Sequence, residues 1–489
     1  EAGEGQNITH QQKKMAEKAL KQFRDRFQIP VPDDKVADAP FYKPEEDSPE
    51  IKYLHERRRA LGGYLPQRPE NAEPLKVPEL SAFEVLLRDS GDREMSTTMA
   101  FVRALSVLSR DKGLDKHLVP IVPDEARTFG MEGLFRQMGI YSPKGQLYEP
   151  QDADQLMYYR EDKKGQVLQE GINEAGAMSS WIAAATAYTN HGVEMIPFYA
   201  YYSMFGFQRV GDLCWAAGDM QAKGFLMGGT AGRTTLNGEG LQHEDGHSHV
   251  MASAIPNCVS YDPTFAYEMA VIIQDGIKRM YQDQEKVFYY ITMMNENYHQ
   301  PAMPEGSEEG IRRGMYLFRK GGKGKTRVQL MGSGVILREV IEAADMLKKD
   351  WSVDSDVWSC TSFTELRRDG IDCERWNMLH PDKDARTPYV TECLEGHDGP
   401  AIASTDYMRS FADQIRPYVD RRFVVLGTDG YGRSDTREKL RHFFEVDRYY
   451  VTIAALNALA DEGKIKKSKV AEAIKKYGVN PDAPNPVTV

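Results

Sequence analysis

The stretch that decides the fold is "MIPFYAYY", residues 195–202, a run of largely apolar residues without polar positions in alternation. The segment "MSSWIAAATAYT" (178–189) precedes it, and "GDLCWAAGDMQAK" (211–223) and then the short apolar run "FLMGG" (225–229) follow it. Strands that are apolar on both sides are typical of parallel sheets, which helices cover on both faces. The alternation of helix and strand therefore predicts a doubly wound, mostly parallel α/β sheet.

The same alternation extends over residues 74–303. Further strands are predicted at 117–122, 258–262 and 286–294, and further helices at 97–110 and 266–281. Ligands of such sheets bind beyond the carboxyl ends of the strands. Three groups of polar or aromatic residues follow predicted strands, namely Asp124–Glu125, Tyr202–Phe205 and the loop 236–250. We expect them to converge on one crevice.

The regions on either side differ from this central part. Residues 304–489 repeat the strand–helix pattern on a smaller scale, beginning with "RVQLMGSGVILREVIEAADMLKK" (327–349), which predicts a smaller α/β domain. Residues 1–73 contain a helix expected to start at Thr9 as its N-cap, followed by a linker rich in proline and acid. We interpret this first region as the end of another domain, and because the chain starts at Glu1 we expect an upstream part.

Composition excludes several classes of function. The 489 residues carry a formal net charge of −11, and no basic face indicates a nucleic-acid partner. The longest apolar stretch is too short to span a membrane. Five scattered cysteines without a C-x-x-C pair are typical of reduced thiols. These features predict a cytoplasmic globular protein.

The loop "LNGEGLQHEDGHSHV" (236–250), called the histidine loop below, contains three of the eleven histidines of the chain. The spacing of His243, His247 and His249 could bind zinc, but the motif is not H-E-x-x-H and three glycines disfavour a regular helix. An acid/base or substrate-orienting role is a second interpretation. The third is a loop whose carboxylates and imidazoles bond one another and the backbone.

Three further places each allow two interpretations. Glu174 precedes an apolar helix, so it either stabilises the helix N-terminus or exchanges a proton with a bound heterocycle, and the residues alone favour the first. Tyr202 and Phe205 either pack in the core or form a stacking surface for a planar cofactor. His10 lies in a polar loop, where it is either without a role or a proton carrier brought in by loop closure.

Several long motifs together resemble one family, the homodimeric, thiamin-diphosphate-dependent decarboxylating component of the bacterial pyruvate dehydrogenase complex. They are "PDEARTFGMEGLFRQ" (123–137), "GINEAGA" (171–177), "PFYAYYSMFGFQRVGDLCWAAGD" (197–219), "GRTTLNGEGLQHEDGHSH" (232–249), "NENYHQPAMPEG" (295–306) and "LGTDGYGRSDTREKLRHFFEVD" (426–447). The resemblance covers essentially the whole chain but only the later part of the family's polypeptide. The family's G-D-G motif is absent, so we expect the Mg²⁺ ligands in an upstream domain.

The resemblance implies roles for residues around the cofactor. Glu174 would hydrogen-bond a ring nitrogen of the aminopyrimidine of thiamin diphosphate, Phe205 would stack on that ring, and Tyr202 would lie close by. Asp124 and Glu125 match the family's acidic pair near the aminopyrimidine.

It also implies roles for residues around the substrates. His243 would help to hold pyruvate and its adduct, with Glu239 nearby, and the histidine loop would not be a metal site. His10 matches a histidine of a mobile active-centre loop, linked to reductive acetylation of the lipoyl group, and Glu4 matches a residue that orders the closed loop. One relative has a lysine where this chain has Gln6, which argues against a salt bridge of this residue in loop closure but not against the role of His10.

The domains take their roles from the same resemblance. Residues 1–73 would be the end of the diphosphate-binding domain with the mobile loop and a linker, 74–303 the pyrimidine-binding domain, and 304–489 the transketolase-like C-terminal domain. Expected partners are a second copy in a homodimer, pyruvate, and the dihydrolipoyl acetyltransferase component with its lipoyl domain. The alternatives are a non-catalytic fragment or assembly subunit, and a metal-dependent hydrolase that uses the histidine loop.

Overall fold

The computed structural model describes residues 5, 7, 13–64, 71–123, 126–151 and 159–489, which fall into two compact units, 1–68 and 69–489. The first unit contains α1 (Glu17–Arg26), the short 3₁₀ helix η2 (Val36–Asp38) and α2 (Pro49–Ala60). The first helix begins at Glu17 and residues 13–16 are not helical, so it starts later than the sequence predicted. Thr9 lies outside the described residues.

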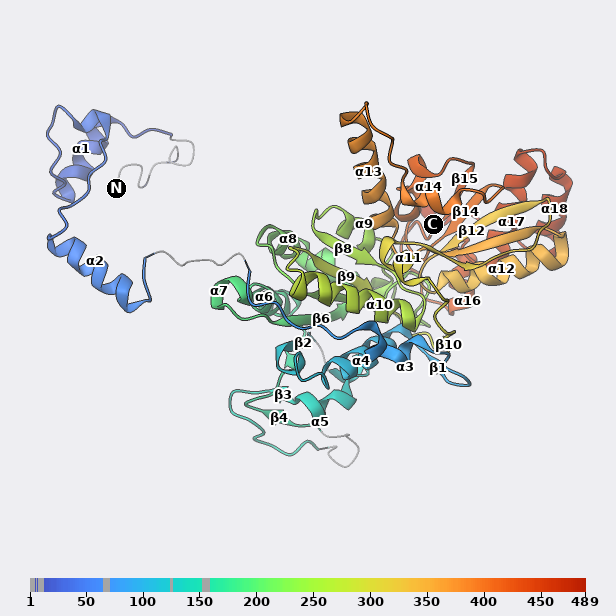
Figure 1. The fold of residues 1–489 in the computed structure, drawn as a ribbon, viewed down its shortest axis with the longest axis horizontal. Helices are drawn as coiled ribbons and strands as arrows, with labels where there is room; N and C mark the ends of the chain where they lie inside the picture. Colours follow the sequence, from blue (N-terminus) through green and yellow to red (C-terminus); the bar gives the residue numbers. More distant parts are fainter. Residues whose placement is uncertain (1–4, 6, 8–12, 65–70, 124–125, 152–158) are drawn as a thin grey trace. The chain divides into compact units, whose positions relative to one another are not determined.

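The larger sheet of the second unit is parallel throughout, with strand order β5-β2-β6-β7-β9-β8. Figure 1 labels β2, β6, β8 and β9 of this sheet. Its strands are β2 (Leu118–Val122), β5 (Leu168–Gln169), β6 (Ile196–Tyr202), β7 (Phe225–Gly229), β8 (Cys258–Tyr261) and β9 (Phe288–Thr292). The helices around it are α4 (Thr97–Leu108), α6 (Glu174–Ala185), α7 (Ala187–His191), α8 (Gly206–Asp219), α9 (Ser248–Ser253) and α10 (Ala266–Ile277). The predicted doubly wound parallel sheet is confirmed.

Strand β6 shows why the sequence is apolar on both sides. Successive side chains of a strand point to opposite faces of the sheet. Phe198 and Ala200 belong to the core shared with α4 and α10, whereas Tyr199 and Tyr201 belong to the core shared with α6 and α8. All four are buried. A strand covered by helices on both faces therefore has no position left for an exposed polar side chain.

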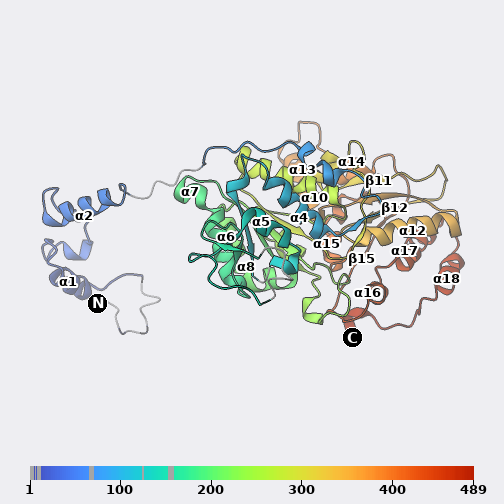
Figure 2. The same cartoon turned by 90° about the horizontal axis from the view of Figure 1, so that it is seen from below.

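The smaller sheet has strand order β11-β13-β12-β14-β15, in which only β11 runs antiparallel to its neighbour. Its strands are β11 (Tyr316–Arg319), β12 (Arg327–Gly332), β13 (Asp354–Ser359), β14 (Ala401–Ser404) and β15 (Phe423–Leu426). Helices α12 (Ile336–Trp351) and α17 (Arg448–Asp461) pack on one face, with α18 (Lys467–Lys476) beside α17 (Figure 2). Helices α13 (Phe363–Leu379), α14 (Tyr389–Leu394) and α15 (Arg409–Asp413) pack on the other.

Short elements complete the second unit. They are the strand pairs β1 (Glu94–Met95) with β10 (Tyr298–His299) and β3 (Ile140–Tyr141) with β4 (Glu161–Asp162), and the helices α3 (Glu84–Leu87), α5 (Phe135–Met138), α11 (Glu308–Arg313) and α16 (Arg437–Phe443). Among the described residues, no helix has the length and apolar character needed to cross a membrane. All five cysteines are free thiols, and burial raises the pKa of Cys214 to about 12.

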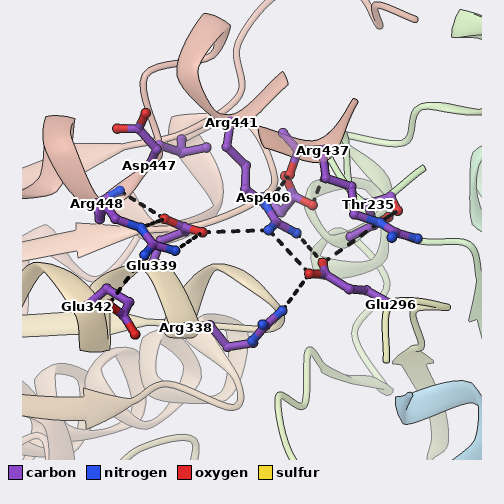
Figure 3. A network of polar contacts seen from close by, with 12 residues as sticks. Thr235, Glu296, Arg338, Glu339, Glu342, Asp406, Arg437, Arg441, Asp447 and Arg448 are labelled. Atoms are coloured by element: carbon purple, nitrogen blue, oxygen red, sulfur yellow. Dashed lines mark hydrogen bonds and ion pairs between the residues drawn. The ribbon is translucent and has the colours of Figure 1, made fainter. Parts of the chain in front are cut away.

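A network of buried and half-buried charges links the segment after β9 to helices α12, α16 and α17 (Figure 3). Glu296 follows β9 and accepts hydrogen bonds from Arg338 on α12, at 2.6 Å, and from Arg441 on α16. Arg441 also lies 3.6 Å from Glu339, which Arg448 binds through two nitrogens. Burial alone would raise the pKa of Glu296, but the positive charges of Arg441 and Arg338 lower it below its ordinary value. The network thus gives each of its most buried charges, Glu296, Glu339 and Arg441, an opposite charge nearby.

Glu296→Ala is expected to lower the free energy of unfolding by about 3 kcal/mol, because it leaves Arg441, whose side chain is 7% exposed, without its closest counter-charge. The matched control is Glu342→Ala. Glu342 is a half-exposed partner of Arg448 in the same network, so its loss should change the free energy of unfolding by less than about 1 kcal/mol. Urea unfolding measures the free energy of unfolding of both variants. Equal losses would show that the burial of Glu296 and Arg441 adds nothing to stability.

Candidate active site

Glu174 occupies the first position of α6, where its backbone is fixed from two sides. The side chain of Asn173 accepts a hydrogen bond from the backbone N–H of Gly176 at 3.1 Å and so caps the helix. The hydroxyl of Tyr199 on β6 donates to the backbone carbonyl of Glu174 at 3.3 Å. The Glu174 residue is only 8% exposed. The carboxylate of Glu174 is therefore largely shielded from solvent at the start of α6.

Arg209 joins this carboxylate to an aromatic surface. Its guanidinium donates from Nη1 to Oε1 of Glu174 at 2.7 Å and lies over the ring of Phe205 at 4.1 Å from the centroid. Sequence reasoning missed Arg209, although it lies inside the aromatic motif. The available signal was its spacing of four residues from Phe205, which brings two side chains onto the same side of a helical turn.

Tyr202, Phe205 and His243 form one cluster of rings. Tyr202 ends β6 and Phe205 ends the 3₁₀ turn η7 (Ser203–Phe205), whereas His243 comes from the histidine loop. The His243 ring lies 5.6 Å from the Tyr202 ring and 5.2 Å from the Phe205 ring, centroid to centroid. The predicted convergence of these two strand ends is thus observed. Glu239 lies beside His243, with 4.0 Å between Oε2 and Nδ1.

The other two histidines of the loop point elsewhere. His247 bonds the side-chain amide of Gln208 at 2.6 Å. His249 is buried, bonds the hydroxyl of Thr292 at 3.0 Å and stacks on Phe411, and burial lowers its pKa to about 3. Throughout the described ranges, no group of three or more histidine, cysteine, aspartate or glutamate side chains could hold a metal ion. The three histidines thus have separate partners in the described structure.

The smaller domain clamps the histidine loop in place. The carbonyl of Asp435 accepts from the N–H of Gly238 at 3.0 Å, the side chain of Asn237 accepts from the N–H of Arg437 at 3.0 Å, and the carbonyl of Gly246 accepts from the N–H of Met408 at 2.7 Å. Both ends of the loop are held by backbone groups from residues roughly 160 to 200 positions away in the sequence. The position of His243 therefore depends on the contact between the two domains.

Gly432 lets the two segments approach at the centre of the clamp. A Cβ atom at this position would lie 2.5 Å from the carbonyl oxygen of Leu241 and 2.6 Å from Cβ of Glu244. Both distances are shorter than real contacts allow, so any side chain at this position must push the histidine loop away.

Buried acids lie behind the loop. Glu244 is fully buried next to Arg233 and Asp406, and neither of its carboxyl oxygens has a hydrogen-bond partner among the described residues. Burial raises the pKa of Glu244 to about 9, and the nearby charge of Asp406 adds to this shift. Burial also raises the pKa of Asp406 to about 7, although the hydroxyl of Thr234 donates to it at 2.8 Å. Glu244 is therefore protonated at neutral pH.

The remaining residues singled out from the sequence lie outside the described residues. They are Glu4, Gln6, His10, Asp124 and Glu125. The last two directly follow Pro123 and the carboxyl end of β2, which is the neighbour of β6 in the sheet. Their predicted place beyond this strand end stays a prediction.

Two family models match the chain. Residues 75–301 match the pyruvate dehydrogenase E1 component middle domain, and residues 314–447 match the transketolase-like TK C-terminal domain. Solved structures of transketolases share the fold. The enzyme of Campylobacter jejuni superposes with a TM-score of 0.58 at 15% identity, over 90% of this chain and 59% of that one. The enzyme of Leishmania mexicana gives 0.57 at 15% identity, over 96% and 53%.

Curated relatives are much more similar in sequence. Proteins named pyruvate dehydrogenase E1 component from Cupriavidus necator, Pseudomonas aeruginosa and Escherichia coli K12 are 65%, 62% and 60% identical. The alignments cover 100%, 99% and 99% of this chain, but 55% of each relative. The chain therefore spans about half the length of the curated relatives it matches.

Gly432→Ala is expected to lower the free energy of unfolding by about 1–3 kcal/mol, because the new methyl group overpacks the clamp against the carbonyl of Leu241. Gly211→Ala is the control. Gly211 lies inside α8 with no atom within 4 Å of an added Cβ, so the change should be neutral or stabilising. Thermal unfolding compares the two variants. If Gly432→Ala unfolded at the same temperature as the native protein, the histidine loop could move away from residue 432 without loss of stability.

Glu244→Gln should stabilise the protein at high pH. An unfolded glutamate ionises near pH 4.3, whereas Glu244 in the folded protein keeps its proton to about pH 9, so folding becomes less favourable as the pH rises between these values. Glutamine is neutral in both states and avoids this loss. The free energy of unfolding of the variant should therefore exceed that of the native protein by about 1–3 kcal/mol at pH 8, and the two should differ little at pH 4.5.

The control for this pH dependence is Glu239→Gln, in the same loop. The side chain of Glu239 is 53% exposed, so its loss should leave the difference in stability between pH 4.5 and pH 8 unchanged. Urea unfolding at the two pH values measures both variants. A Glu244→Gln protein that gains no more stability at pH 8 than at pH 4.5 would contradict the buried, protonated state.

Proposed function

Because the chain belongs to the pyruvate dehydrogenase E1 component family, we propose that it serves the thiamin-diphosphate-dependent oxidative decarboxylation of pyruvate. The second half of the proposed reaction is reductive acetylation of the lipoyl group of a dihydrolipoyl acetyltransferase partner. The enzyme would thus be an oxidoreductase with a disulfide acceptor, acting as a homodimer within a cytoplasmic multienzyme complex.

One observation carries this proposal. A planar group that donates hydrogen bonds, the guanidinium of Arg209, bonds Glu174 while it stacks on Phe205. The aminopyrimidine of thiamin diphosphate needs the same two neighbours, a carboxylate in its plane and an aromatic face against its ring. The residues present therefore fit the cofactor. Tyr202 and His243 line the same cluster of rings, at the strand ends where a parallel sheet binds ligands.

When bound, thiamin diphosphate supplies a nucleophilic carbon and an electron sink. Glu174 would hold a proton in common with a ring nitrogen of the aminopyrimidine, and the low exposure of Glu174 would keep water from competing for that proton. Phe205 would hold the ring by stacking, with Tyr202 beside it. These two contacts orient the cofactor, and orientation is the contribution that a protein makes to cofactor chemistry.

His243 is proposed to act on the substrate. Its imidazole would hydrogen-bond the carboxylate of pyruvate and stabilise negative charge that develops on the carbonyl oxygen. Glu239, 4.0 Å away, would orient the ring. The clamp from the smaller domain would keep both residues in place during the reaction, because it fixes the loop at Gly238 and Gly246.

The other roles rest on the resemblance alone. Asp124 and Glu125 are proposed as the acidic pair near the aminopyrimidine, and His10 as the proton donor to the lipoyl sulfur, with Glu4 ordering its loop. The domain boundaries at residues 73 and 303 and the requirement for Mg²⁺ are proposals of the same kind.

Glu174→Gln is expected to lower the pyruvate-dependent reduction of an artificial electron acceptor by at least about a hundredfold, because glutamine cannot take or return the proton. The assay uses the intact protein with thiamin diphosphate and Mg²⁺ present or withheld. Glu84→Gln is the control, since Glu84 is also the first residue of a helix, α3, but is exposed. Full activity of Glu174→Gln would overturn its role.

The native protein in the same assay separates the remaining alternatives. Activity that requires both thiamin diphosphate and Mg²⁺ supports the proposed reaction. A folded protein without activity that also fails to bind thiamin diphosphate would favour the non-catalytic subunit instead.

A further inference from the structure

A cavity of about 470 Å³ lies in the smaller domain, where strands β12, β14 and β15 begin. These strands run parallel, so their starts lie at one edge of the sheet and their ends at the other. The clamp on the histidine loop comes from residues that follow the ends of β14 and β15. The cavity is therefore at the opposite edge from the candidate active site, and its volume is that of a small-molecule site.

Positive charge dominates the lining of this cavity, which we call the basic pocket. The lining contains four cations and two carboxylates, namely Lys325, Arg327, Arg421, Lys464, Asp398 and Glu462. This excess contrasts with the formal net charge of −11 of the whole chain. The cations belong to three separate segments of the sequence, so the fold, and not a local run of basic residues, brings them together.

A buried carboxylate positions two groups in the wall of the basic pocket. Asp356 on β13 has no exposed side-chain surface, and it bonds Nη2 of Arg327 at 2.8 Å and Nδ1 of His397 at 2.9 Å. The backbone N–H of Gly321 and the side-chain amide of Gln329 also donate to it, at 2.7 and 3.2 Å. Burial alone would raise the pKa of Asp356, but these hydrogen bonds, of which that to His397 contributes most, lower it below its ordinary value. An ionised carboxylate therefore fixes an arginine and a histidine beside the cavity.

Arg421 is held beside the cavity by backbone carbonyls. It donates to the carbonyl of His397 and, at 3.0 Å, to that of Leu394. The side chains of Arg327, His397 and Arg421 are 18%, 20% and 16% exposed, so each is largely shielded from bulk solvent while it lines the cavity. Nε of Arg327 is buried and has no hydrogen-bond partner among the described residues. The wall thus keeps a donor that no described protein group satisfies.

Lys325 and Lys464 complete the lining as flexible cations. Both residues are exposed, and neither side chain forms an ion pair in the described parts of the chain. Lysine and arginine bind phosphate and carboxylate groups through charge-assisted hydrogen bonds, and arginine can use two N–H groups at once. Two fixed arginines and two flexible lysines around one cavity therefore suit a molecule with more than one anionic group.

We propose that the basic pocket binds a small molecule that carries two or more phosphate or carboxylate groups. A small molecule fits better than a nucleic acid or an acidic protein, because the most shielded cations, Arg327 and Arg421, line a cavity of limited volume. This inference does not rest on the proposed function, since the pocket belongs to the smaller sheet and lies at its edge remote from the histidine loop.

Calorimetric titration of the intact protein with inorganic pyrophosphate, and separately with tricarballylate, tests the proposal at an ionic strength of about 0.15 M. Mg²⁺ is left out, so that no metal holds pyrophosphate at the proposed cofactor site. At least one probe should bind saturably, with a Kd of about 1 mM or lower. The probe with the lower Kd shows whether the pocket prefers phosphate or carboxylate groups.

Two lysine variants and a control locate the binding. Lys325→Gln and Lys464→Gln should each raise the Kd about fivefold to tenfold, because each removes one charge-assisted contact without breaking an ion pair of the described fold. Lys383→Gln is the matched control. Lys383 is exposed but does not line the cavity, so this variant should keep the native Kd to within about twofold.

A further variant separates a built pocket from attraction by surface charge. Thr326 lines the cavity, so Thr326→Phe keeps every charge but places a larger side chain in it. Saturable binding should be lost in this variant, and its melting temperature shows whether it folds. If it does not fold, the two lysine variants decide, because their side chains hold no other group by an ion pair.

Two results would overturn the proposal. One is the absence of saturable binding of either probe up to about 10 mM. The other is binding that a folded Thr326→Phe protein and both lysine variants leave unchanged, because the probe would then occupy another site. Neither result bears on the proposed reaction with pyruvate, which the assay with thiamin diphosphate tests separately.

Discussion

The pairing of β6 with β7 is the constraint on which the rest of the site depends. The two strands run parallel and in register, so that Tyr202 at the end of one lies opposite Gly229 at the end of the other. The chain leaves β6 into the turn that carries Phe205, and it leaves β7 toward the histidine loop. Parallel strands end at the same edge of a sheet. The aromatic turn after β6 and the polar loop after β7 therefore start next to each other. His243 then packs on both aromatic rings.

The second domain completes what the first sheet begins. A loop with several glycines has no intrinsic preference for one conformation. Here the segments around Met408 and 432–437 hold it through hydrogen bonds of their backbone groups, and burial behind the loop raises the pKa of Glu244 and of Asp406. The geometry around His243 therefore depends on the contact between the two domains, so that changes far from the histidine loop can alter it.

Arg209 compensates a carboxylate that the fold holds away from water. Glu174 is only 8% exposed, and such burial is unfavourable for an unpaired carboxylate. A half-exposed arginine four residues from Phe205 pairs with it at 2.7 Å and covers the aromatic ring at 4.1 Å. The guanidinium therefore joins the start of α6 to the aromatic turn that follows β6.

The sequence by itself determined the parallel α/β architecture, because a largely apolar strand such as β6, without polar residues in alternation, is typical of burial between two helical layers. It also determined that Tyr202, Phe205 and the histidine loop follow strand ends, and its long motifs indicated the family. Only the tertiary structure decided the direction of each side chain. The spacing of His243, His247 and His249 allowed a metal site, but contacts with Gln208 and with Thr292 and Phe411 turn two of them away. The clamp on the loop and the pairing of Arg209 with Glu174 join residues that are 35 to about two hundred positions apart. Such contacts follow from how the elements pack, which no local pattern of residues encodes.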